Sequence, residues 1–152
     1  MKRLLTCFLI MSCSFLTQAQ EATLQETEKW IFTYGTKLFQ EGSTLYFYWE
    51  NGEKELIHIV NDDGYLQECS FKWSDIRTVA AISGEKSLLV FVFKTDLDAI
   101  GEKGKTKISS IDFYFESKDG LLRFYKAIEH LFKLKQLTDV KFENSITLEN
   151  KF

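Results

Sequence analysis

The apolar residues of segment 118–136 (KDGLLRFYKAIEHLFKLKQ) recur every three or four positions, directly after a region in which apolar and polar residues alternate. This spacing predicts an amphipathic α-helix with an apolar stripe made of Leu121, Phe124, Tyr125, Ile128, Leu131 and Phe132. An apolar sheet face has to be buried against another element, so we expect the helix to cover a sheet. Ser117 or Asp119 is placed to cap its N-terminus. A helix on a membrane surface would instead carry a strongly basic polar face.

Six segments before this helix alternate with the period of two that is typical of β-strands. They cover residues 43–50, 54–60, 65–73, 76–82, 87–94 and 107–115. Asn51-Gly52 predicts a hairpin between the first two, because a type I′ turn needs positive φ at both central positions. The segment 87–94 (SLLVFVFK) is apolar on both faces, so we expect it to be central or covered on both sides. The charged segment 95–106 is predicted to be a loop.

Residues 23–40 are predicted to form a leading helix, because Thr23 and Glu26 match a capping box and Gly42 supplies a stop. Gly35 lies inside this segment and is expected to mark a close approach to the sheet. The sequence therefore predicts an α+β fold. It has an N-terminal helix, an antiparallel, bent sheet or partial barrel of six to seven strands, and the C-terminal amphipathic helix as its cap.

The N-terminus reads as a secretory signal peptide. Lys2 and Arg3 form a charged region, an apolar stretch follows, and Ala19 stands at the −1 position of a signal-peptidase site. We expect cleavage after Ala19 and a secreted or periplasmic protein. The alternative is a lipoprotein, because the residues before Cys13 loosely match a lipobox, and lipidation there would anchor the domain to a membrane.

The charge balance argues against nucleic acid as a partner. The chain has 22 acidic and 19 basic residues, and removal of residues 1–19 takes away Lys2 and Arg3 and no acid, which moves the net charge from −3 to −5. A phosphate backbone rewards clustered basic residues, and an anionic membrane surface does the same. We expect a membrane as a partner only if Cys13 is lipidated.

The sequence offers little catalytic chemistry. Plain secretion would leave Cys69 as the one thiol, and it lies in an alternating strand pattern, which favours a buried apolar role over a redox or catalytic one. His58 and His130 stand at no metal-ligand spacing from a cysteine or carboxylate, so structural roles are expected for both. We expect no enzyme, no catalytic residue, no metal and no cofactor.

Two segments resemble a P-loop and an EF-hand loop, but neither fits the motif it resembles. The segment 99–106 (AIGEKGKT) departs from a P-loop only at Ala99, but a P-loop opens a helix, and a strand pattern follows Thr106. Asp96, Asp98 and Glu102 offer oxygen ligands, yet counting from Asp96 as an EF-hand loop puts isoleucine and lysine at two ligand positions.

Four consecutive aromatic residues, 46–49 (YFYW), give both faces of the first strand large rings. One face should belong to the core. The other face, with Tyr46 and Tyr48 as candidates, offers flat contact surfaces for a protein, a glycan or a small apolar ligand. Alternatively, the leading helix or the tail covers that second face.

The Asn51-Gly52 hairpin, the WSDI step at 73–76 and the helix RFYKAIEHLFKL at 123–134 follow one another in a strand meander closed by a helix. This order resembles the pleckstrin-homology-like superfold over about residues 43–135. The chain is also similar to small secreted bacterial proteins of uncharacterised function, a resemblance that implies a fold and a compartment but no activity. Lipid-binding members of the superfold have basic residues around the first hairpin. Here that hairpin reads ENGEKE, so headgroup binding is not carried over.

We therefore expect a signal peptide at 1–19, a single PH-like domain at 20–136 and a C-terminal tail at 137–152. The expected function is a secreted or periplasmic, non-enzymatic protein-interaction or accessory module. The alternative is glycan or small apolar ligand binding through residues 46–49.

Overall fold

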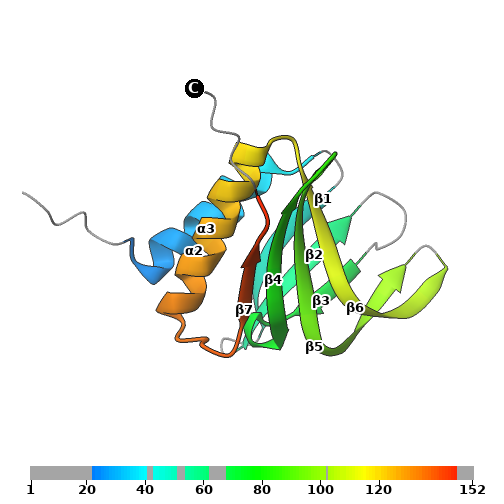
Figure 1. Ribbon diagram of the computed structural model, residues 1–152. Helices are drawn as coiled ribbons and strands as arrows, with labels where there is room; N and C mark the ends of the chain where they lie inside the picture. Colours follow the sequence, from blue (N-terminus) through cyan, green and yellow to red (C-terminus); the bar gives the residue numbers. More distant parts are fainter. Residues whose placement is uncertain (1–21, 41–42, 51–53, 62–67, 102, 147–152) are drawn as a thin grey trace, which may run out of the picture.

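The computed structural model describes the backbone of residues 22–40, 43–50, 54–61, 68–101 and 103–146, and the side chains of residues 22–40, 57, 69–101 and 103–146. Both α-helices lie to one side of a single sheet (Figure 1). The elements in chain order are α2 (Leu24–Thr33), the 3₁₀-helix η2 (Gly35–Leu38), β1 (Ser43–Glu50), β2 (Lys54–Asn61), β3 (Glu68–Phe71), the 3₁₀-helix η3 (Trp73–Asp75), β4 (Ile76–Ser83), β5 (Ser87–Gly101), β6 (Gly104–Phe115), α3 (Lys118–Leu134) and β7 (Lys141–Asn144). The predicted α+β class is confirmed.

Helix α3 covers the sheet as its periodicity predicts. All six residues of the predicted apolar stripe are buried. The helix begins after Ser117, whose Oγ accepts a hydrogen bond from the backbone N–H of Gly120 at 3.1 Å. Ser117 is therefore the N-cap. Asp119 lies in the first turn, where its negative charge interacts favourably with the positive end of the helix dipole.

Strand β5 is the centre of the sheet, as the two-faced apolar pattern of 87–94 predicts. Strand β6 runs antiparallel along one edge of β5. Along the other edge, β4 pairs with the first half of β5 and β3 pairs with the second half, at Ala99 and Ile100. Helix η3 separates β3 from β4, so the sheet divides at this point into two parts that share β5.

The core fills the space between the inner face of the sheet and the helices, and it is rich in phenylalanine. The ring of Trp73 in η3 lies 5.7 Å from that of Phe132 in α3 and 6.1 Å from that of Phe91 in β5. We expected Trp73 to end a strand at 65–73, but it lies in the 3₁₀-helix η3. The reason is that the chain bends here to pass from β3 to β4. The hydrogen bond from Lys72 N–H to Asp75 Oδ2 at 2.7 Å holds this bend.

The expectation of a wholly antiparallel sheet is wrong. Strand β7 pairs with β4 in parallel and lies inside the segment 137–152 that we expected as a tail. Its Phe142 points into the core, with its ring 5.5 Å from that of Phe132 and 5.8 Å from that of Tyr125. Helix α3 returns the chain across the sheet, which brings β7 to the edge of β4 in the same direction.

The charged segment 95–106 is a long hairpin and not a loop. Leu97 pairs with Ile108 and Ala99 with Thr106, so β5 and β6 continue to a turn between Gly101 and Gly104. Ala99 and Gly101 are buried while Asp98 and Ile100 are exposed, which is the alternation of a strand. The acidic and basic side chains on the exposed face hid this pattern. Gly104 has a φ of 103°, a conformation that favours glycine.

The leading helix is shorter than predicted, because α2 ends at Thr33 and η2 begins at Gly35. The capping box of Thr23 and Glu26 is present. Tyr34, which directly follows α2, is 53 % exposed. Gly35 does mark a close approach, but to α3 and not to the sheet: a Cβ added to it would lie 2.8 Å from two ring atoms of Phe124.

Candidate binding surface on the sheet

The outer face of β5 carries apolar residues that the rest of the described chain leaves partly exposed. Leu89, Phe91 and Phe93 point into the core and are at most 3 % exposed. Leu88, Val90 and Val92 alternate with them and are only half-buried. Helices α2 and α3 both lie on the side of the sheet where the core is (Figure 1). Within the described residues, these outer side chains therefore have the sheet beneath them and no helix above them.

The neighbouring strands extend this face. Across β4, Ile82 pairs with Leu88 and Ala80 with Val90; across β6, Tyr114 pairs with Leu88. Side chains of directly opposite residues in adjacent strands share a face of the sheet. Ile82 is 44 % exposed, the second largest exposure of a big apolar side chain in the described residues. We name this surface the outer patch; it consists of Thr78, Ala80, Ile82, Leu88, Val90, Val92 and Tyr114.

One acidic residue stands at the β6 edge of the outer patch. Asp112 of β6 is the direct cross-strand partner of Val90. Burial by its neighbours raises the pKa of the Asp112 carboxyl above its ordinary value, although much of the side chain remains exposed. Near this face, the Nζ of Lys86 lies 5.0 Å from the centre of the Tyr114 ring. In the described part of the chain, the Asp112 carboxylate makes no hydrogen bond and no ion pair.

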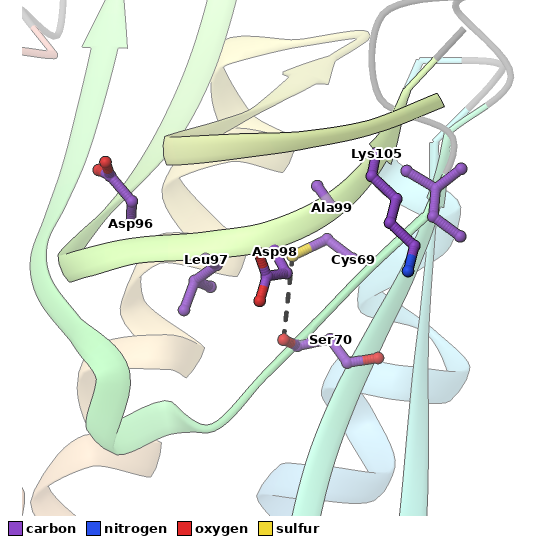
Figure 2. A pocket seen from close by; sticks show the side chains of 8 residues that line it. Cys69, Ser70, Asp96, Leu97, Asp98, Ala99 and Lys105 are labelled. Carbon is purple, nitrogen blue, oxygen red and sulfur yellow. Dashed lines mark hydrogen bonds between the residues drawn. The ribbon is translucent and has the colours of Figure 1, made fainter. Parts of the chain in front are cut away.

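A second candidate is an open groove where β3 and β5 separate (Figure 2). Its volume is about 630 Å³, and its described lining is Cys69, Ser70, Asp96, Leu97, Asp98, Ala99, Ile100 and Lys105. Figure 2 shows Asp96 lying apart from Cys69 and Lys105. Asp98 is engaged by Lys107, whose Nζ lies 3.0 Å from its Oδ1.

The surroundings of the Cys69 thiol in this groove do not make it reactive. Cys69 is 2 % exposed, and burial raises its pKa to about 11. Its Sγ lies 3.9 Å from the backbone oxygen of Ser70, a weak contact (Figure 2). A thiolate is the reactive form, so a thiol with this pKa stays protonated and inert near neutral pH. The expected apolar role of Cys69 is confirmed.

The aromatic residues singled out in the sequence lie in β1, where the backbone of Tyr46 pairs with His58 and that of Tyr48 with Leu56. Their side chains, and those of residues 47, 49 and 58, lie outside the described residues, as do Cys13 and Ala19. Ligand binding by Tyr46 and Tyr48 therefore stays a prediction. His130 is in place as a structural residue: its Nε2 lies 3.0 Å from the backbone oxygen of Ala22, which ties α3 to the start of α2.

The two motif-like segments are explained by the β5–β6 hairpin. Lys105 and Thr106 lie within β6, and no helix follows them, so the P-loop arrangement is absent there. Among the described side chains, no group of three or more His, Cys, Asp or Glu is arranged to hold a metal ion. Neither described helix combines the length and the hydropathy needed to cross a membrane.

Sequence reasoning missed the outer patch as a candidate site, although its main signal was present. The segment 87–94 is apolar on both faces, and we expected burial to account for both. The missing information was which elements cover the sheet, since all described helices gather on the inner face. Comparison with family models, with curated proteins and with solved structures finds no match to this chain.

Proposed function

We propose that this chain is a secreted or periplasmic, non-enzymatic module that docks a protein partner on the outer patch. The observation that carries the proposal is the half-exposed apolar series Leu88, Val90 and Val92 on the central strand, continued by the exposed Ile82. A contiguous apolar surface on an otherwise polar exterior is a candidate site for protein interaction. A sheet face offers this surface on a rigid scaffold, since its inner side is fixed by the core.

The chemistry of the described residues favours binding over catalysis. The groove at β3 and β5 holds a protonated thiol, an acid already paired with a lysine, and a further acid that stands apart. A reactive cysteine needs a lowered thiol pKa, and burial instead raises the pKa of Cys69, so this thiol is not an activated nucleophile. Export by the leader at 1–19, with membrane anchoring through Cys13 as its alternative, is part of the same proposal.

A PH-like arrangement is the fold we propose behind this surface. A bent sheet closed on one side by a C-terminal helix supports it. The parallel strand β7 and the leading helix α2 are additions to the superfold's usual plan. Fold likeness alone names no ligand, so the argument for docking rests on the outer patch.

Two isoleucines give a matched test of the docking surface. Ile82 is 44 % exposed in the outer patch, and Ile100 is 41 % exposed in the second half of β5, beside the groove. The variants I82K and I100K make the same change at similar exposure. We expect cross-linking of the tagged chain to its partner in the cell envelope to be lost with I82K and kept with I100K.

Each alternative gives its own result in this test. Loss of capture with I100K alone would move the site to the groove, and equal capture by both variants would refute docking on the outer patch. Loss with a Tyr46→Ala, Tyr48→Ala double variant, with I82K still active, would favour the aromatic strand and its glycan or apolar ligands. Urea unfolding of each variant shows whether a loss of capture is merely a loss of folding.

A further inference from the structure

We infer that the segment docking on the outer patch brings a lysine or arginine side chain, flanked by apolar residues, to Asp112. The inference rests on the proposed function and adds the chemistry of the partner to it. It depends on where Asp112 lies, on what surrounds it and on how large the patch is.

Asp112 lies at the β6 edge of the outer patch, beside the central strand β5. Its direct neighbour on β5 is Val90, and the diagonal neighbours are Leu88 and Val92. Along β6 the residues that share its face are Ser110 and Tyr114, two positions away on either side. A segment that covers Val90 and Leu88 therefore passes directly beside Asp112.

Among the described residues, no cationic side chain pairs with the Asp112 carboxylate. Strand β5 presents only apolar side chains beside it, and Ala80 and Thr78 of β4 lie beyond them. Lys86 sits over the Tyr114 ring instead of bonding the carboxylate. Removing an unpaired carboxylate from water is unfavourable unless a cation or hydrogen-bond donors replace the water. An apolar residue placed over Asp112 would take this charge out of water, whereas a basic residue there would pair with it, so Asp112 favours a basic segment.

The size of the patch favours a short segment over a second copy of the chain. Three strands spaced about 4.8 Å apart and five residues of β5 at about 3.3 Å each cover on the order of 200–300 Å². A stable dimer buries roughly 800 Å² on each partner. A two-fold dimer centred on Val90 would also bring two Asp112 carboxylates into one interface, where like charges repel.

Selection from a random peptide library displayed on phage tests the inference with the full-length chain as bait. We expect the wild-type chain to enrich peptides that hold Lys or Arg between apolar residues. For a selected peptide, we expect binding to weaken about tenfold with Asp112→Asn. The charge reversal Asp112→Lys should instead enrich peptides with Asp or Glu at that place. Asp119→Lys, on an exposed acid of α3 on the opposite side of the sheet, is the control and should select as wild type does.

The outcomes separate this inference from the proposed function. A selected pool that I82K abolishes, but that shows no basic residues and no response to Asp112→Lys, overturns the inference and leaves the docking surface standing. A pool that responds to neither I82K nor Asp112→Lys, or no enrichment above background, overturns both. Urea unfolding of Asp112→Asn and Asp112→Lys shows that the compared chains are folded.

Discussion

The contact between Gly35 and Phe124 gives a sharp test of how the leading helix is seated. Gly35 opens η2 at the point where it crosses α3, and a Cβ built on it would meet Cδ2 and Cε2 of Phe124 at 2.8 Å and Cζ3 of Trp30 at 3.1 Å. Carbon atoms prefer a separation of about 3.5–4.0 Å, so the phenylalanine ring would have to move by about 0.7 Å or more. We therefore expect Gly35→Ala to destabilise the fold.

The ring of Phe124 has little room for such a movement. It is fully buried, and the rings of Phe39 and Phe115 lie 5.0 and 5.5 Å from it. Overpacking of a filled core costs about 1–3 kcal/mol. The alanine returns about 0.5–1 kcal/mol by restricting the unfolded chain. The expected net loss is about 1 kcal/mol and at most about 2.5 kcal/mol, and for a chain of this length each kcal/mol lowers Tm by about 2–4 °C.

Urea unfolding followed by tryptophan fluorescence measures this loss as a lower midpoint with an unchanged slope. Gly84→Ala is the matched control, because a Cβ there meets no atom within 4 Å. We expect it to lie within about 0.5 kcal/mol of wild type. Gly35 does not have positive φ, so backbone strain does not complicate the comparison. A Gly35→Ala protein with a midpoint equal to that of Gly84→Ala would refute the packing described for α2, η2 and α3.

Three further outcomes follow from the contacts above. Ser117→Ala removes the N-cap of α3 and should lower the free energy of unfolding by about 1 kcal/mol, measured by urea unfolding. Cys69, with its buried thiol and a pKa of about 11, should resist iodoacetamide at pH 8 in the folded chain and react after unfolding, which peptide mass spectrometry reads at that residue. Burial raises the pKa of the Asp112 carboxyl, so the folded chain binds the carboxyl proton more tightly than the unfolded chain does. Wild-type stability should therefore fall as the pH rises from the ordinary aspartate pKa through the raised one. Asp112→Asn lacks this fall and should be the more stable protein at pH 7, with the difference vanishing in acid; a constant difference across the titration would contradict the raised pKa.

Local patterns in the sequence determine the parts of the fold that depend on one element and its neighbour. The apolar stripe of α3 follows from helical spacing, and all six predicted residues are buried. The capping box at Thr23 and Glu26 forms as predicted. The central place of β5 follows from its apolar character on both faces. In each case the signal lies within one turn or one strand.

Features that depend on distant contacts were not predictable in the same way. The strand β7 has only four residues, and it forms because α3 brings it to β4 and Phe142 fills a gap against Phe132. The hairpin 95–106 hid its alternation under charged side chains on the exposed face. Trp73 fits a strand pattern in the sequence, but the bend at η3 removes it from the hydrogen-bonded strand β3.

The candidate site shows the same division. The sequence indicated that residues 87–94 are apolar on both sides, but only the placement of the helices shows which side is left uncovered. Asp112 attracted no notice in the sequence, because its significance comes from Val90 on the neighbouring strand. A polar residue becomes a candidate for recognition when the sheet register places it among apolar neighbours.

The short strand β7 also has a protective consequence for the molecule. Without it, β4 would expose the backbone N–H and C=O groups along an edge that carries Val79, Ala80, Ala81 and Ile82. Open edges of that kind recruit strands from other molecules and start aggregation. Strand β7 replaces this edge with one that is only four residues long and carries Lys141 and Glu143. We therefore expect proteolysis ahead of Lys141 to leave the edge of β4 open and to promote aggregation, which light scattering of the clipped chain would detect.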